Sequence, residues 1–477
     1  MGQEWVSVTG EEKHSSSWLV DVEKMLEDDN PGSRSTEEQR WKAQSIYLVP
    51  EWLKGTNNKS YQPQGVSLGP FHHGAPNLHP MEEHKRRALV HLIKRSKRTL
   101  SDFISAIDEV AEELQAAYGK DLHVKWRNDR RRFVEMMLTD GCFLLEIMKT
   151  IPDYELHDPV FSSDGRYQIE DIIRPDMLLI ENQLPLLVLK KILGVLPPGY
   201  LDQTDIDISL MVVECLALEH ENHESLDIVD AFESHLEVEM DRKINLMVLK
   251  FLGRGHEGCG IANTKLRLHP LELYHGSLIY KEGDREVREE SQQCEYETMP
   301  SVLKMHEAGI KFSESKRDNL LYIDFKGAVL TMPMIVVHDD TESLYLNLMA
   351  LERLHFGVGN LVTAYVSFMD DMIVSAKDVA MLSSNRVLHN VLGCDEEVAK
   401  LFNGTLNRGQ LRHTIHDLRD VQFDVNAYCK KSCHKWRATL IRTYFRNPWA
   451  FISLAVATIL LIATLLQTVY TVKSNKS

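Results

Sequence analysis

The chain has 477 residues, 43% of them hydrophobic, and a formal net charge of −16 at pH 7. Such a hydrophobic fraction is typical of a globular protein with a buried core. The negative charge argues against a general nucleic-acid-binding role, because a phosphate backbone would be repelled on average. The seven cysteines are scattered and odd in number, so they do not indicate a disulfide framework.

Changes in composition along the chain divide it into several parts. Residues 1–40 are polar and acidic, and we expect a flexible segment without a cleavable secretory signal. The other expected parts are a globular domain over 41–430 with a variable insertion at about 253–299, a basic juxtamembrane segment over 431–447, a transmembrane helix over 448–472 and a short tail over 473–477.

A long loop and two helices are predicted at the start of the globular domain. Prolines and glycines recur over Pro50–Gly74 and exclude a long helix there, although this loop carries Tyr61 and other apolar side chains to bury. Pro80 then opens a helix, and apolar residues at helical spacing continue over Leu89–Leu114. The same periodicity predicts a second helix over about 127–150.

Three polar side chains, Glu181, Asn182 and Gln183, interrupt an otherwise apolar run over residues 176–189. Each would be costly to bury without a partner, so we expect them to cap chain ends or to bridge segments. Pro185, directly after them, fits the first turn of a new helix.

The rest of the domain is predicted to be mainly helical, which gives a mainly α (α+β) fold. Further helices are expected over about 208–218, 244–252, 342–355, 362–375, 377–382, 396–403 and from near 411 onward. A small β element is expected near 310–337, where Leu321, Ile323 and Phe325 alternate. Residues 253–258 match G-x-G-x-x-G, but a poor helix start follows, which favours a flexible loop over a nucleotide site.

The segment Trp449–Val472 contains no charged residue, and a helix needs about 20 apolar residues to cross a bilayer. Trp449 and Tyr470 mark its ends, where aromatic rings favour the membrane interface. Basic residues crowd its N-terminal side, so the positive-inside rule predicts that the bulk of the chain is cytosolic. Cys429 and Cys433, about one helical turn apart beside these basic residues, are candidates for S-palmitoylation, with inert thiols as the alternative.

Two N-glycosylation sequons begin at Asn58 and Asn403. They would be used only if the bulk of the chain were lumenal. A glycan on either residue would therefore contradict the predicted cytosolic orientation, and the sequence does not distinguish a plasma membrane from an endomembrane.

Several blocks of sequence resemble the plant family called domain of unknown function 247. They include IYLVPEWL, YQPQGVSLGPFHHG, DMLLIENQLPLLVLKKI and YFRNPWAFISLAVA, and together the blocks cover nearly all of 45–472 in the family's order. The resemblance implies a largely helical plant protein with a C-terminal membrane segment and no established enzymatic activity. Some grass members of the family lie at self-incompatibility loci and act in pollen. Leu48 stands where family members commonly carry Arg, so any pair that this Arg makes with a carboxylate is lost here.

The sequence contains no nucleophile elbow and no Walker A loop, and we predict no catalytic residue, cofactor or metal. Four histidines lie close together between His72 and His84. The adjacent His72 and His73 cannot easily bind one ion, which favours hydrogen-bonded loop packing over a metal site.

We therefore expect a membrane-tethered interaction or signalling component that binds another protein. One alternative is an unrecognised enzyme with a site near Tyr61–Gly74 and Glu181–Pro185, and another is a self-incompatibility determinant. The residues expected to form a functional or structural motif are Pro50, Tyr61, Gly69, Pro70, His72, His73, Glu181, Asn182, Gln183 and Pro185.

Overall fold

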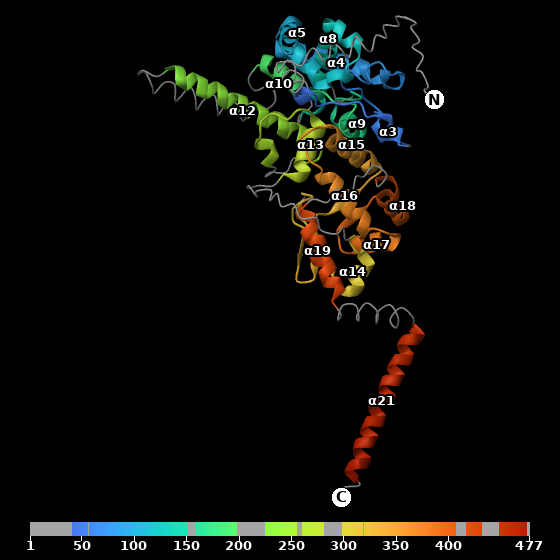
Figure 1. Cartoon of the computed structure of the whole chain (residues 1–477). Helices are drawn as coiled ribbons and strands as arrows, with labels where there is room; N and C mark the ends of the chain where they lie inside the picture. The colour runs from blue at the N-terminus through green and yellow to red at the C-terminus, as the bar shows by residue number, and fades with distance from the viewer. Residues whose placement is uncertain are drawn as a thin grey trace, which may run out of the picture.

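The computed structural model describes residues 41–55, 57–149, 158–197, 225–254, 260–280, 298–317, 319–406, 416–431 and 448–474. Within these ranges the chain is mainly helical, with a few short strands and one long apolar helix near its C-terminal end (Figure 1). The expected fold class, mainly α with a small β element, is confirmed.

Helix α8 is the centre of the N-terminal half, because α4, α5 and α10 all pack against it (Figure 1). Its side chains Phe133 and Phe143 are fully buried. The elements of this half are α3 (Glu51–Lys54), η1 (Asn58–Tyr61), η2 (Pro76–Leu78), α4 (His79–Ser96), α5 (Leu100–Glu109), α6 (Ala111–Tyr118), η3 (Gly119–Asp121), α7 (Val124–Asn128), α8 (Arg130–Ile147), α9 (Ser163–Asp176) and α10 (Leu186–Val195).

The helix expected to continue to Leu114 is in fact three helices, α4, α5 and α6. Lys97 ends α4 in the left-handed conformation, with φ of 56°. Thr99 and Asp102 then form a capping box that starts α5: each side chain accepts the main-chain N–H of the other. The apolar period continues across this break, so the periodicity alone does not reveal it.

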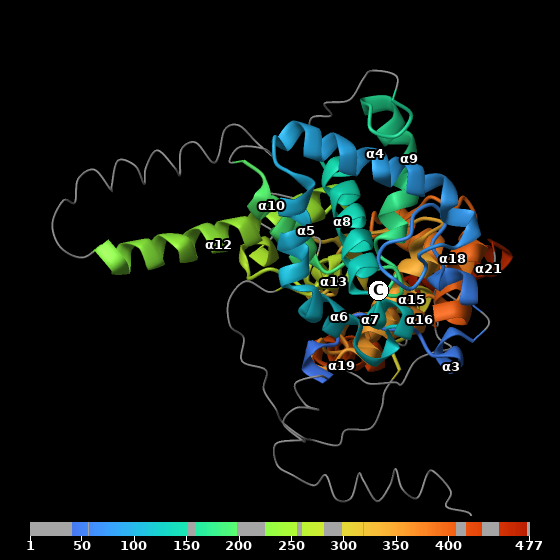
Figure 2. The ribbon, with the colours of Figure 1, turned by 90° about the horizontal axis from the view of Figure 1, so that it is seen from above.

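The middle of the chain forms α12 (Ser225–Phe251), η4 (Gly260–Asn263) and α13 (Pro270–Ile279). Helix α12 is much longer than the predicted 244–252, and its N-terminal part extends away from the body in both views (Figures 1 and 2). Helix α13 lies inside the expected insertion, yet it packs on α12, α15 and α16 with Leu271 and Leu273 fully buried. The predicted helix 208–218 and residues 255–258 of the glycine motif lie outside the described residues.

The C-terminal half is a second group of helices with two small sheets. Its elements are α14 (Val302–Ala308), β1 (Lys311–Glu314), β2 (Asp324–Lys326), β3 (Val329–Met332), β4 (Ile335–Val337), α15 (Thr341–Leu354), α16 (Leu361–Met372), α17 (Ala376–Ser384), β5 (Leu388–Asn390), α18 (Asp395–Lys400), η5 (Leu401–Thr405) and α19 (His416–Lys430). The first sheet has the order β1-β3-β2, with β1 parallel and β2 antiparallel to β3. The second sheet pairs β4 with β5 in parallel.

Helix α21 (Pro448–Ser474) stands apart from the body (Figure 1). Within it, Ile452–Thr471 is long and apolar enough to cross a membrane, with a mean hydropathy of 2.2, and none of this segment is buried against the rest of the described chain. The predicted end residues Trp449 and Tyr470 are both exposed. The hydroxyls of Ser453 and Thr464, among others, donate to main-chain oxygens one turn earlier in the same helix, which satisfies them without water.

Candidate functional site

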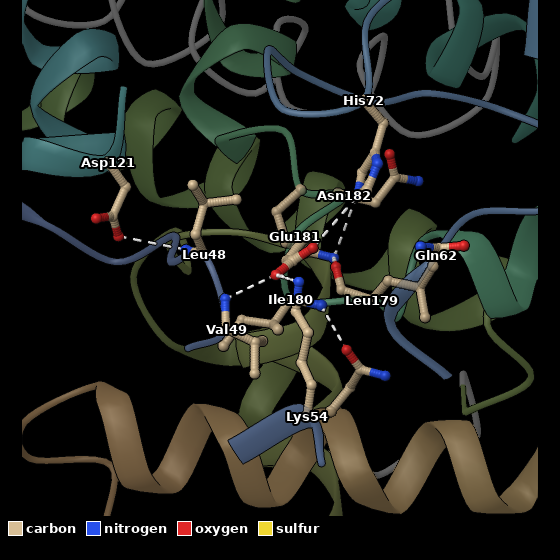
Figure 3. Close-up of polar contacts among 12 residues, drawn as sticks. Leu48, Val49, Lys54, Gln62, His72, Asp121, Leu179, Ile180, Glu181 and Asn182 are labelled. Carbon is tan, nitrogen blue, oxygen red and sulfur yellow. Dashed lines mark hydrogen bonds and ion pairs between the residues drawn. The ribbon is translucent and has the colours of Figure 1, made fainter. Parts of the chain in front are cut away.

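The predicted motif residues from two separate stretches of sequence meet inside the N-terminal half (Figure 3). The loop over residues 45–73 wraps along the turn over residues 176–185, and the side chains of the turn bind the main chain of the loop. We call this contact the polar junction. It forms because the loop has few main-chain partners of its own, and buried N–H groups must find acceptors elsewhere.

Glu181 holds the start of the loop. Its Oε1 atom accepts the main-chain N–H of Val49 at 2.7 Å and lies 3.0 Å from Lys54 Nζ (Figure 3). Burial raises the pKa of the Glu181 carboxyl, and the contacts with Lys54 and Val49 oppose that rise. Pro50, between these two partners, is the N-cap residue of α3, so it sets the direction in which α3 begins.

Asn182 and Asp176 hold the middle of the loop. Asn182 Oδ1 accepts the N–H of Leu68 at 2.7 Å, and its Nδ2 donates to the carbonyl of Val66 at 3.0 Å. Asp176 accepts three consecutive main-chain N–H groups, from residues 64–66, at 2.7 to 2.8 Å. Burial nevertheless raises the pKa of Asp176 to about 6, against the lowering effect of these three donors. A fully satisfied carboxylate of this kind fixes the path of the loop.

Gln183 connects the junction to α13. Its Nε2 donates to the carbonyls of Met177 and Leu179, at 2.7 and 2.6 Å, and its Oε1 accepts the N–H of Leu271 at 2.9 Å. Beside it, His269 Nε2 lies 3.0 Å from the Ser45 carbonyl oxygen, which can only accept a hydrogen bond. Burial lowers the pKa of His269 to about 3, so the ring is neutral and donates from Nε2.

Gly69 and Asp140 close the far end of the loop. Gly69 has φ of +73°, and a Cβ atom placed there would lie 2.6 Å from both the Gln183 carbonyl oxygen and Tyr118 Oη. The N–H of Gly69 donates to Asp140 Oδ2 at 2.9 Å, and Asp140 Oδ1 accepts from the fully buried Lys85 at 2.8 Å. Only glycine fits here, because both the φ angle and the close approach exclude a side chain.

His72 and His73 contact different neighbours. His72 Nε2 lies 3.7 Å from Glu181 Oε2, and His73 packs edge-on against Trp126 with ring centroids 5.2 Å apart. Burial, and then the charge of Lys54, lower the pKa of His72 to about 4; burial also lowers the pKa of His73. His72 Nε2 and His73 Nδ1 are buried and lack hydrogen-bond partners among the described residues, so the loop packing is less fully hydrogen-bonded than expected.

The remaining motif residues are placed by packing. Tyr61 and Pro70 are buried, and burial raises the pKa of Tyr61 to about 12. Pro185 is the N-cap of α10, directly before the predicted first turn. In the part of the chain that the structure describes, no group of three or more His, Cys, Asp or Glu residues is arranged to hold a metal ion. The polar side chains of the junction bind mainly main-chain groups, and these contacts hold the loop in position.

Leu48 lies at the rim of the junction. Its side chain is partly exposed, and its main-chain N–H donates to Asp121 Oδ2 at 3.3 Å (Figure 3). Asp121 is thus a carboxylate in direct contact with the position where the family resemblance puts an Arg. The same carboxylate accepts from Gln44 Nε2 at 3.0 Å, so it is not left without a partner.

Of the two candidate lipidation sites, only Cys429 is described. It lies one residue before the end of α19, is half-buried against the core, and burial raises the pKa of its thiol. Both features disfavour reaction at this sulfur, because the thiolate is the nucleophile. Cys433 lies outside the described residues.

The fold and the polar junction define a mainly helical protein whose central loop is fixed by buried carboxylate and amide side chains, and which has a candidate membrane-spanning helix at its C-terminal end. The chain belongs to the plant family DUF247, described as a plant protein of unknown function, whose family model covers residues 46–463. The resemblance stated from the sequence blocks is thus confirmed.

Two curated proteins of Arabidopsis thaliana are similar to the chain over most of its length. UPF0481 protein At3g47200 is 26% identical over 441 residues, which cover 90% of this chain and 86% of that protein. Putative UPF0481 protein At3g02645 is 24% identical over 516 residues, which cover 94% and 93% of the two chains. A comparison with solved structures finds no match.

Proposed function

We propose that the protein is anchored in a membrane by α21 and that its helical body binds another protein there, as an interaction or signalling component. The observation that carries the proposal is the exposed apolar surface of α21: Ile452–Thr471 has no packing partner in the described chain. An apolar helix of this length is costly to expose to water and favourable in a bilayer.

The cytosolic orientation of the body is supported by charge. Lys and Arg residues are frequent over 430–446, whereas only Lys473 and Lys476 follow the apolar segment. The positive-inside rule favours the more basic flank on the cytosolic side.

Binding of a protein partner is supported by exposed aromatic side chains beside the polar junction. Trp52 on α3 is 65% exposed, and the guanidinium carbon of Arg353 lies 4.7 Å from its ring centroid. Phe356 follows the end of α15 and is fully exposed, and Gly357 after it has φ of +94°. Aromatic residues and Arg are enriched in protein interfaces, and Trp and Arg are also enriched among the residues that contribute most to binding.

Membrane anchoring is tested with the full chain expressed in plant cells. We expect it to stay in the membrane pellet after alkaline carbonate extraction, and a variant that lacks residues 448–477 to become soluble. A full chain that is released by carbonate would overturn the proposed anchor.

Orientation is tested by glycosylation, and the structure identifies Asn58 as the informative sequon. Asn58 is exposed at the start of η1, whereas the side-chain amide of Asn403 donates to the carbonyls of Ile373 and Ala399. We expect no gel shift on deglycosylation, and an N-terminal tag that protease removes from intact vesicles. A shift that Asn58→Gln abolishes would reverse the orientation and make recognition between cells, including self-incompatibility, the leading function.

Partner binding is tested by photo-crosslinking at Trp52 and Phe356 in intact membranes, through a photoreactive amino acid at each position. We expect one discrete crosslinked product at both positions. Val124, which is 62% exposed on α7, gives the matched control position. Equal crosslinking at all three positions would contradict a specific interface.

A further inference from the structure

Strand β1 lies at the edge of its sheet and has one free row of main-chain groups. The N–H groups of Lys311 and Ser315 donate to carbonyl oxygens on the side of β3, at 2.9 and 2.8 Å. Because N–H groups alternate in direction along a strand, those of Phe312 and Glu314 point away from β3. Within the described ranges, no other strand pairs with this edge.

A groove is lined by β1 together with the residues that follow it. Its volume is about 470 Å³. It is lined by Phe312, Ser313, Glu314, Ser315, Lys316, Asn385 and Arg386. One wall is therefore the edge of β1 with the residues that follow it, and the other wall is the chain that leaves α17. An extended peptide that occupies such a groove can pair its main chain with the free N–H and carbonyl groups of the strand.

The second wall contains a residue in an unfavourable backbone conformation. Arg386 has φ of +59°, in the left-handed region that favours glycine. Its N–H donates to the Ser383 carbonyl at 3.1 Å, and the next N–H, of Val387, donates to the Leu382 carbonyl at 3.0 Å, as at the end of many helices. Glycine would satisfy these bonds without strain, whereas the arginine adds a cationic side chain to the lining of the groove.

We propose that this groove binds an extended peptide with an acidic side chain from a partner protein, and that the peptide adds to β1 as a further strand. Two cationic residues, Lys316 and Arg386, line the groove against one acidic residue, Glu314, which gives the groove an excess of positive charge in a chain whose net charge is −16. The inference rests on the proposed function, since it names the class of partner and a second surface, in addition to Trp52 and Phe356, that the partner contacts.

The edge of β1 favours a peptide over an anionic lipid headgroup as the occupant. A headgroup needs only the positive charges, whereas a peptide also uses the alternating donors and acceptors of the strand. The two occupants therefore differ in one testable respect, which is the dependence of binding on main-chain hydrogen bonds.

The test uses the full chain in detergent and a fluorescent peptide of about ten residues, alternating Thr and Val with one central Glu. Binding is followed by fluorescence anisotropy. We expect the dissociation constant to rise about tenfold when Lys replaces the central Glu, the effect of one charge-assisted hydrogen bond. A peptide with N-methyl groups on alternate main-chain nitrogens should not bind, because it cannot pair with the strand.

One variant in the groove and one outside it make a matched pair, Arg386→Gly and Lys97→Gly. Arg386→Gly removes the charge and relieves the left-handed strain, so the variant should fold at least as well as the wild type while binding the acidic peptide about tenfold more weakly. Lys97→Gly relieves the same kind of strain, at φ of 56° at the end of α4, outside the groove. We expect Lys97→Gly to leave peptide binding unchanged.

The proposal is overturned if Arg386→Gly and the wild type bind the acidic peptide equally, or if the N-methylated peptide binds as well as its parent. Binding of vesicles that contain phosphatidylserine, lost in Arg386→Gly and without any peptide binding, would overturn it in favour of a lipid site. Failure here is distinguishable from failure of the proposed function: if the peptide does not bind while discrete crosslinking at Trp52 and Phe356 persists, the partner is real and the groove is not its site.

Discussion

The carboxylate of Glu181 accepts the main-chain N–H of Val49 at 2.7 Å, although 132 positions separate the two residues. The same oxygen lies 3.0 Å from Lys54 Nζ. One buried side chain therefore fixes both ends of the segment 49–54, which contains α3. This segment also carries the exposed Trp52. Glu181 therefore fixes the position of the segment from which Trp52 extends into solvent.

Glu181→Ala should lower the free energy of unfolding by about 3 kcal/mol, because it leaves the buried Val49 N–H without its acceptor and the Lys54 ammonium with only the longer contact to Glu51. Urea unfolding of the full chain in detergent measures the change. Glu51→Ala is the control: the Glu51 side chain is 85% exposed, and its pair with Lys54 at 3.7 Å should be worth less than about 0.5 kcal/mol. Equal stability of the two variants would contradict the role assigned to Glu181.

Asp176 should make the stability of the protein depend on pH between about 4 and 6. Its folded-state pKa is raised to about 6 from the usual 3.8, so the folded chain holds a proton that the unfolded chain has already lost in this range. The stability that protonated Asp176 contributes is therefore lost as the pH rises through about 6, by about 3 kcal/mol in total, since one pKa unit corresponds to about 1.4 kcal/mol.

The measurement is urea unfolding of the wild type and of Asp176→Asn at several pH values from 4 to 7. Asn cannot ionise, so the difference in stability between the two proteins should shift in favour of the variant as the pH rises. Parallel pH profiles would show that the carboxyl group of Asp176 does not titrate in this range.

Gly69→Ala should destabilise the protein by more than about 3 kcal/mol. The new Cβ would lie 2.6 Å from the Gln183 carbonyl oxygen and from Tyr118 Oη, in addition to the strain of φ at +73°. Gly74→Ala is the matched control, because Gly74 has φ of +86° but a Cβ there would meet no atom within 4 Å. Thermal unfolding should show a loss of only about 1 kcal/mol for the control; similar losses for both variants would mean that backbone strain, and not the close approach, dominates.

The sequence predicts one side of the polar junction well and the other side poorly. Glu181, Asn182 and Gln183 are conspicuous because they interrupt an apolar run, and burying them demands partners. Asp140 and Asp176 are equally buried, but each lies in a helix whose polar residues are expected to face solvent. The spacing of these residues does not show that their carboxylate oxygens accept the N–H groups of the loop. Those contacts depend on how separate helices pack.

Two further differences between the predicted and the observed elements have local causes. The break between α4 and α5 carries a readable signal, Thr99 followed three residues later by Asp102, which the continuous apolar period hides. His269 lies in a segment whose charged surroundings indicate an insertion, yet it is fully buried as the N-cap of α13. A polar composition averaged over 253–299 does not resolve a ten-residue helix within that segment that belongs to the core.

If the chain is S-acylated on the N-terminal side of α21, the acyl group should be on Cys433 and not on Cys429. The Cys429 thiol is half-buried on α19, and burial raises its pKa, so little thiolate is available for attack on an acyl donor. Exchange of hydroxylamine-labile acyl groups for a biotin tag should therefore label the wild type and Cys429→Ser equally and leave Cys433→Ser unlabelled. Cys142→Ser is the control variant and should keep the full label, since Cys142 is fully buried. Loss of the label in Cys429→Ser would mean that the end of α19 opens in the membrane-bound protein, and an unlabelled wild type would show that both sulfurs are inert thiols.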